Sequence, residues 1–160
     1  MTTIVCNLEG MAGDTRVSTE GGAFFHSSKI FRIGNSLFGL CGDAVMGLVM
    51  VEWLKTAQRS RNALYKQWTE NTERYACELL ELRAEPYGAS LHIWDGWGVP
   101  MKLNEKRWAI GSGQVGALAA LDGGADLQEA IKRAANYDQY SGAPIQLEML
   151  QVVSRKKRKR

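Results

Sequence analysis

Strand patterns and helix patterns alternate along the chain, and their order limits the fold more than any other feature. Two short β-branched runs open the sequence, and a hairpin around Gly34-Asn35 follows them. Two helices, two strands, two more helices and a last strand come next. The predicted strands cover residues 2–8, 15–19, 29–33, 36–41, 89–94, 107–110 and 144–153. Two facing sheets with a helix layer outside each would bury all their apolar faces, so we predict an α+β fold with four layers, αββα.

Four helices are predicted from apolar spacing and from residues that favour helix ends. The first follows Asp43, its predicted N-cap, and runs to about Gln58. The second covers about residues 67–84, with Pro86 beyond its end. The third is rich in alanine and leucine, begins at Ser112-Gly113 and ends at Gly123-Gly124. Asp126 and Glu129 have the spacing of a capping box, which predicts the start of the fourth.

Length and charge indicate one domain with a separate tail. The chain has 160 residues, enough for one core, and we assign residues 1–153 to that domain. Six of the 20 basic residues form the terminal run 155–160 (RKKRKR), which leaves 14 basic against 17 acidic residues and a net charge of −3. Residues 154–160 are therefore predicted to be a disordered basic tail. A nucleic-acid partner is not expected, because the rest of the chain has no basic patch interleaved with aromatics.

The absence of certain sequence signals leads to expectations about cellular location, metal sites and cofactors. No apolar run reaches membrane-spanning length, and no signal peptide precedes the first strand, so we expect a cytoplasmic protein without a membrane partner. Three cysteines (Cys6, Cys41 and Cys77) lie in apolar runs and match no zinc spacing, which predicts buried free thiols. Two isolated histidines (His26 and His92) indicate no metal site. We expect no cofactor.

Thr2 is the first candidate for chemistry. If Met1 is removed, Thr2 carries a free α-amine beside its hydroxyl, and such an amine has a pKa of about 7.7–8. A hydroxyl nucleophile with its base on the same residue is a known arrangement for acyl transfer. Many proteins begin with Met-Thr, so Thr2 alone is weak evidence for a nucleophile. Support comes from polar residues and a glycine that lie further along the chain at strand and helix ends, namely Asp14, Lys29, Gly42, Ser112, Asp138 and Ser141. Each alone also fits a cap, a turn or an exposed strand position.

Together these motifs resemble the proteasome β-type family of N-terminal threonine hydrolases, which includes 20S proteasome β subunits and bacterial HslV-type peptidases. The resemblance covers residues 2 to about 150, and TTIV, GD, the lysine before a strand, IGSG and DQYSG occur in the family's order. It implies that Thr2 is the nucleophile and that its amine is the base. It also implies an Asp14–Lys29 pair, with Lys29 lowering the pKa of the Thr2 amine and hydroxyl.

The resemblance assigns three further roles. The Gly42 N–H matches the oxyanion-hole donor at a helix start. Three polar residues match those that hold the N-terminal amine: Ser112, Asp138 and Ser141. Leu40 and Ala44 match pocket positions that select the side chain before the cut, and their size predicts a modest apolar pocket.

Several features depart from the family pattern. The segment from Thr2 to Asp14 is shorter than usual, and only Met1 precedes the nucleophile, as in the HslV type. An alignment on HslV would place Asn136 where the 20S alignment places Asp138. This mixture predicts a divergent bacterial or phage branch.

The leading hypothesis is a threonine-type endopeptidase subunit of a self-compartmentalising, homo-oligomeric double ring that cuts unfolded polypeptides. The family implies a separate ring-shaped ATPase as partner, since this chain has no phosphate-binding GxxxxGK[ST] motif. Two alternatives stay open. One is an inactive ring that keeps the fold, and the other is an amidase of the same fold class that acts on a small molecule.

Overall fold

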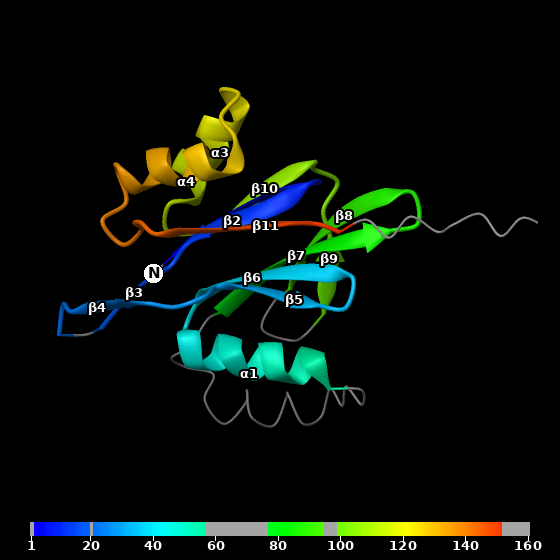
Figure 1. Cartoon of the computed structure of the whole chain (residues 1–160), viewed down its shortest axis with the longest axis horizontal. Helices are drawn as coiled ribbons and strands as arrows, with labels where there is room; N and C mark the ends of the chain where they lie inside the picture. The colour runs from blue at the N-terminus through cyan, green and yellow to red at the C-terminus, as the bar shows by residue number, and fades with distance from the viewer. Residues whose placement is uncertain (1, 20, 57–76, 95–98, 152–160) are drawn as a thin grey trace, which may run out of the picture.

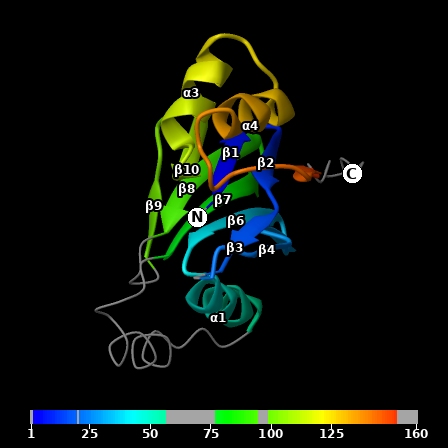
Figure 2. The same cartoon turned by 90° about the vertical axis from the view of Figure 1, so that its left-hand side faces the viewer.

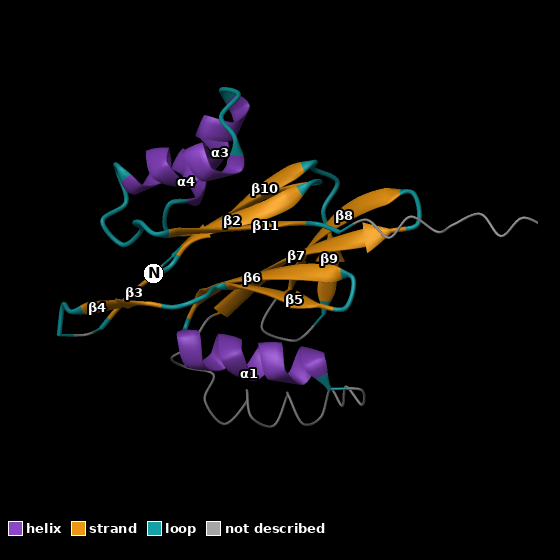
Figure 3. Cartoon of the chain, in the orientation of Figure 1, coloured by secondary structure: helices purple, strands orange, loops and turns teal. Residues whose placement is uncertain are grey.

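The computed structural model describes residues 2–19, 21–56, 77–94 and 99–151. Its strands form two larger antiparallel sheets and a small ribbon (Figures 1 and 3). The first sheet has the order β10-β1-β2-β11. Its strands are β10 (Arg107–Gly111), β1 (Thr3–Asn7), β2 (Gly10–Asp14) and β11 (Ile145–Met149).

The second sheet has the order β5-β6-β7-β8-β9, and the ribbon pairs β3 with β4. The strands of the second sheet are β5 (Ile30–Ile33), β6 (Ser36–Gly42), β7 (Cys77–Glu85), β8 (Gly88–Trp94) and β9 (Pro100–Lys102). The ribbon consists of β3 (Arg16–Ser18) and β4 (Phe24–His26). Figure 1 shows it extending from the end of the molecule at which β1 begins.

Helices cover the outer faces of both larger sheets (Figures 1 and 2). Helices α3 (Gln114–Asp122) and α4 (Leu127–Ala135) pack on the first sheet, and α1 (Ala44–Lys55) packs on the second. The predicted caps of two helices are present. The Asp43 carboxylate accepts the Met46 N–H at 2.8 Å, and Asp126 accepts the Glu129 N–H at 2.8 Å.

Three apolar clusters join these layers. Between the two sheets lie side chains from both, including Ile4, Met11, Leu80, Leu82 and Ile110. The helix-covered faces have their own clusters, one around Ala130 and Ile131 of α4 and one around Met50 and Leu54 of α1. The mixed fold with outer helices and facing sheets therefore agrees with the predicted class.

A buried carboxylate interrupts the apolar cluster under α1. Glu81 on β7 is only 2% exposed. It accepts hydrogen bonds from the Ser36 hydroxyl at 2.7 Å, from the Trp94 ring N–H at 2.8 Å and from two guanidinium nitrogens of Arg83 at 2.9 Å each. Burial raises the pKa of Glu81, but these donors outweigh it and leave the pKa below its usual value.

The predicted second helix is wrong over its last residues. Residues 77–84 belong to strand β7, whereas residues 67–76 lie outside the described part. Leu79, Leu80 and Leu82 have a spacing that also fits a helix face, but they point to the two faces of a strand that is buried over residues 79–82. The pairing of β7 with β6 and β8 on both sides overrides the helical preference of its glutamates.

Smaller differences concern short strands. Strand β2, which begins at Gly10, was not predicted because its sequence GMAGD has no β-branched residue. The predicted strand 15–19 is reduced to β3, and the last strand ends at Met149 instead of residue 153. Strands β4 and β9, three residues each, were also not predicted.

Candidate active site

Thr2 lies just before β1, against the IGSG segment. Its carbonyl accepts the Ser112 N–H at 2.9 Å, and the residue is only 6% exposed. Gly111 has φ of 93°, and a Cβ there would overlap the Thr2 carbonyl. The first glycine of IGSG is therefore required for the close approach of the N-terminal strand.

A cleft of about 270 Å³ brings Thr2 together with four other predicted site residues: Lys29, Leu40, Gly42 and Ala44. Its remaining lining comes from the ribbon, from the segment after it, from the end of β6 and from the start of α1, namely Val17, Ser18, Ser27, Ser28, Cys41, Asp43, Val45 and Leu48. Gly42 has φ of 92°, a conformation that favours glycine, and this lets β6 turn directly into α1. The predicted nucleophile, lysine, glycine and pocket residues thus share one concave surface.

The predicted Asp14–Lys29 pair is present and buried. Lys29 Nζ lies 3.0 Å from Asp14 Oδ2, and the two side chains are 7% and 0% exposed. Nζ also donates to the carbonyl of Arg16. The other interactions of the Asp14 carboxylate are with backbone N–H groups, from Thr3 at 2.8 Å and from Arg16 at 3.0 Å.

Burial shifts the pKa of each partner in the direction that favours its uncharged form. It lowers the pKa of Lys29, although the Asp14 carboxylate opposes the change. It raises the pKa of Asp14, opposed by Lys29 and by the N–H groups of Thr3 and Arg16. The Lys29–Asp14 pair thus lies in a poorly hydrated wall of the cleft that Thr2 also lines, where electrostatic interactions are strong.

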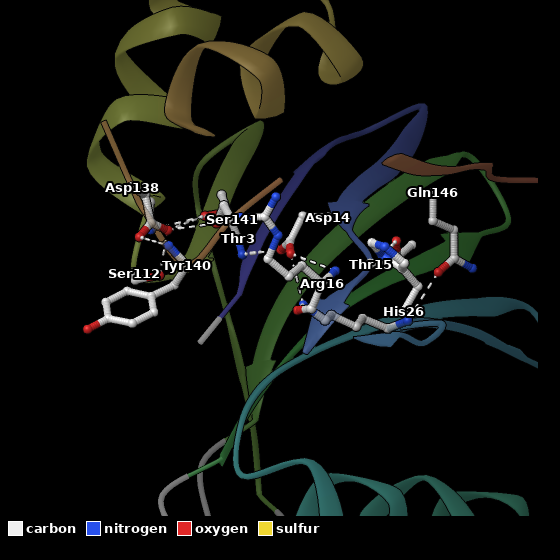
Figure 4. Close-up of polar contacts among 12 residues, drawn as sticks. Thr3, Asp14, Thr15, Arg16, His26, Ser112, Asp138, Tyr140, Ser141 and Gln146 are labelled. Carbon is white, nitrogen blue, oxygen red and sulfur yellow. Dashed lines mark hydrogen bonds and ion pairs between the residues drawn. The ribbon is translucent and has the colours of Figure 1, made fainter. Parts of the chain in front are cut away.

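The three residues predicted to hold the amine form a second group. Asp138 Oδ2 accepts hydrogen bonds from the hydroxyls of Ser112 and Ser141, each at 2.6 Å, and Oδ1 accepts the Tyr140 N–H at 3.1 Å (Figure 4). Burial raises the pKa of Asp138, but these donors outweigh it and leave the pKa below its usual value. Asn136, the alternative from the HslV alignment, is the C-cap residue of α4.

Thr3 connects the two groups and was not singled out from the sequence. Its N–H binds Asp14, and its hydroxyl lies 2.6 Å from the Ser141 hydroxyl and 3.4 Å from Asp138 Oδ2 (Figure 4). The Gly113 N–H donates to the same hydroxyl at 3.0 Å. A threonine inside a strand is ordinary, so only the folded arrangement identifies this role. The residue directly after Thr2 is thereby fixed from both sides.

The remaining reactive side chains lie in other settings. Burial raises the pKa of the thiols of Cys6 and Cys41, and that of Cys77 to about 11, so these cysteines are poor nucleophiles. His26 Nδ1 lies 3.2 Å from the Thr15 hydroxyl. Among the residues that the structure describes, no three His, Cys, Asp or Glu side chains form a group that could hold a metal ion. No described helix has the length and apolar character needed to cross a membrane.

Comparison with known proteins supports the fold. No protein-family model and no curated protein matches the sequence. A solved structure, Thiobacillus denitrificans BPH in complex with epoxomicin, matches with a TM-score of 0.69 and 19% identity. The match covers 94% of this chain and 100% of that chain. At this identity the likeness establishes a shared fold.

Proposed function

We propose that this chain is a threonine-type endopeptidase with the four-layer αββα fold of N-terminal-nucleophile hydrolases. Thr2, exposed by removal of Met1, is its nucleophile. The observation that carries the proposal is the position of Thr2 in a cleft with Lys29, whose ammonium is paired with the buried Asp14. The shared fold with an epoxomicin complex gives further support. The complete set of Thr2, Asp14 and Lys29 favours an active enzyme over an inactive ring.

The reaction begins at the Thr2 hydroxyl. Its oxygen attacks the carbonyl carbon of the peptide bond, and its proton passes to the free α-amine of the same residue, through a water molecule. In this mechanism the ammonium of Lys29, which lines the same cleft, favours loss of protons from both groups, because a nearby positive charge disfavours protonation. The hydroxyl thus loses its proton more readily, and the amine is neutral and ready to accept it near pH 7.

The tetrahedral intermediate then collapses. Its oxyanion is stabilised by the Gly42 N–H at the positive end of the α1 dipole. The carbon–nitrogen bond breaks, and the leaving amine takes the proton from the Thr2 ammonium, which leaves an ester on the Thr2 oxygen. Water attacks this ester and gives a proton to the α-amine. The bond between the acyl carbon and the Thr2 oxygen then breaks, the oxygen takes that proton from the ammonium, and the acid is released. The group of Ser112, Asp138 and Ser141, anchored through Thr3, keeps the amine in place.

The proposal extends to assembly. Family resemblance supports a homo-oligomeric double ring in the cytoplasm that encloses the Thr2 sites, acts on unfolded polypeptides and receives them from a separate ATPase ring. Electron microscopy of the purified particle tests this, because a ring gives class averages with rotational symmetry and a central pore. A monodisperse monomer would contradict the assembly without affecting the chemistry at Thr2.

The central experiment combines N-terminal mass spectrometry with hydrolysis of fluorogenic peptides. We expect Thr2 as the first residue of the mature chain and cleavage of peptides of several residues. Epoxomicin should add its mass to the N-terminal peptide and block cleavage. Preferential turnover of small amides would favour the amidase alternative, and a fully retained Met1 with no cleavage would favour the inactive ring.

Replacing Lys29 by methionine is expected to lower kcat/KM for peptide cleavage by roughly 100-fold or more. The change removes the positive charge near Thr2 and leaves Asp14 as a buried carboxylate without its partner. Methionine keeps most of the side-chain volume. Lys55→Met is the control, because Lys55 is half-exposed on α1 and, within the described part of the chain, forms an ion pair with exposed Glu52 alone. Equal activity of the two variants would contradict the role of Lys29.

Enlarging residue 44 is expected to change substrate preference. Leu40 and Ala44 give the cleft an apolar wall, so peptides with an apolar residue before the cut should be preferred. Ala44→Leu adds volume to this wall and should lower kcat/KM for a peptide with leucine there by about 10-fold relative to one with alanine. Val115→Leu, an exposed change on α3, should leave the ratio unaltered. An unchanged ratio for Ala44→Leu would show that this wall does not contact the substrate side chain.

A further inference from the structure

Gln146 on β11 reaches across from the first sheet to the start of β5 in the second (Figure 4). Its side-chain oxygen accepts the N–H groups of Lys29 at 3.1 Å and Ile30 at 3.2 Å. Its side-chain nitrogen donates to the Ile30 carbonyl at 2.9 Å. Two donors face one end of the amide and an acceptor faces the other, so only one orientation of this side chain satisfies all three.

These contacts occupy the open edge of the second sheet. Among the described strands, β5 lies at the edge of its sheet and pairs with β6 alone. The Leu40 N–H binds the Lys29 carbonyl at 2.9 Å, so the N–H and C=O of the next residue, Ile30, point away from β6. Gln146 satisfies both groups as a further strand would. The sequence contains no signal for this role, since a glutamine in a strand is usually a solvated polar residue.

We propose that Gln146 is a positioning residue for the reaction: it fixes the backbone from which the Lys29 side chain extends to Asp14, at the cleft that Thr2 lines. This inference rests on the proposed function. Lys29 is thereby held at both ends, its backbone by Gln146 and Leu40 and its Nζ by Asp14 and the Arg16 carbonyl.

The position of the Lys29 backbone affects the site because the lysine side chain is long and flexible. Without Gln146, the start of β5 loses three of its hydrogen bonds, and small shifts of the Lys29 Cα are carried along the side chain to the cleft. A displacement of about 1 Å at a catalytic group can cost roughly 100-fold in rate. The Asp14 contact alone leaves the lysine free to follow such a shift.

A second side-chain interaction joins β5 and β11, and it provides a matched control for Gln146. Arg32 of β5 lies 3.5 Å from the carboxylate of Glu148 on β11, and both side chains are about one-third exposed. Glu148 follows Gln146 by two residues on the same face of the strand, but it makes no contact with Lys29 among its described interactions. Glu148→Gln therefore weakens contact between the sheets without touching the Lys29 backbone.

The first test compares Gln146→Leu, Gln146→Asn and Glu148→Gln in peptide cleavage. Leucine preserves the volume and removes the hydrogen bonds, whereas asparagine keeps the amide but is too short to reach. We expect both Gln146 variants to lower kcat by roughly 10-fold to 100-fold with a smaller change in KM. Glu148→Gln should stay within 2-fold of the wild type. Equal effects of Gln146→Leu and Glu148→Gln would overturn the proposal, since they would indicate only loss of contact between the sheets.

The second test does not depend on catalysis and separates this inference from the proposed function. NMR of the ¹³C-lysine-labelled chain follows the titration of Lys29, assigned with Lys29→Met. The charged and titratable groups that face it are Asp14, Arg16 and Cys41. In Gln146→Leu the pair should loosen and admit water, so the Lys29 midpoint should rise toward that of a free lysine. An unchanged Lys29 midpoint in Gln146→Leu would overturn the positioning role, even if the wild type is an active peptidase. A shifted midpoint in a chain without peptidase activity would overturn only the proposed peptidase function.

Discussion

Replacing Thr2 by alanine is expected to lower peptide cleavage by more than about 1,000-fold, the scale seen when the nucleophile of a hydrolase is removed. Alanine keeps the α-amine and the backbone, including the carbonyl that accepts the Ser112 N–H. The hydroxyl and one methyl group are lost, and of these only the hydroxyl oxygen takes part in the proposed attack. Because the side chain is short and lines an open cleft, the fold should be preserved. Hydrolysis of a fluorogenic peptide by the purified variant measures the effect.

Two further variants separate chemistry from packing. Thr2→Ser retains a hydroxyl and an amine and should keep a measurable fraction of the activity. Thr56→Ala removes an exposed hydroxyl that caps the end of α1 and should act as the wild type does. Mass spectrometry must show loss of Met1 in all samples, since a blocked amine cannot serve as base. Cleavage by processed Thr2→Ala at the wild-type rate would disprove the mechanism.

Replacing Glu81 by alanine is expected to lower the free energy of unfolding by about 3 kcal/mol. The change leaves the Trp94 ring N–H and the Ser36 hydroxyl without their acceptor and opens a cavity under α1. Glu85→Ala is the matched control on the same face of β7, where the carboxylate is exposed and accepts only the Ser90 hydroxyl among its described contacts. Glu85→Ala should lower the free energy of unfolding by less than about 1 kcal/mol. Urea denaturation at a fixed protomer concentration measures both.

The pH dependence of this effect has a definite sign. The pKa of Glu81 is lower in the folded protein than in the unfolded chain, because its hydrogen-bond donors outweigh its burial. Its carboxylate therefore stabilises the fold above the unfolded pKa, and this stabilisation is lost as the pH falls through the lower, folded pKa. Glu81→Gln lacks this dependence. The difference between wild type and Glu81→Gln should shrink from neutral pH toward pH 3, and a constant difference would contradict the assignment.

The elements that were predicted from sequence are those with local signals. Asp43 and Asp126 lie at the positions of side-chain caps, and both caps are formed. Strand β7 was missed because its assignment depends on two neighbouring strands and on the hydrogen bonds that allow Glu81 to be buried. A carboxylate in the middle of a strand is a poor sequence signal for a core position, since its partners come from three different strands.

The residues of the candidate site also fall into those that local sequence motifs predict and those that only the folded structure reveals. Thr2, Lys29, Gly42 and the pocket residues were identified from motif order, and they meet in one cleft. Thr3 and Gln146 were missed because their contribution is to hold backbone that is distant in sequence. Gln146 is 116 residues from Ile30, and only the packing of the two sheets brings them together. Motif order identifies groups that take part in chemistry more readily than those that fix their geometry.

The pairing of β1 also affects when the site forms. Thr3 accepts its hydrogen bond from Gly113, 110 residues further along the chain, and β1 lies between β2 and β10 in the sheet. Such distant contacts form slowly, and during synthesis they must wait for the second half of the polypeptide. Early in synthesis β1 can therefore pair with nearby β2 but lacks β10 and Gly113, so the N-terminus is more accessible than in the finished fold. In the proposed mechanism, removal of Met1 is easiest in that interval, before Thr2 takes its place in the cleft.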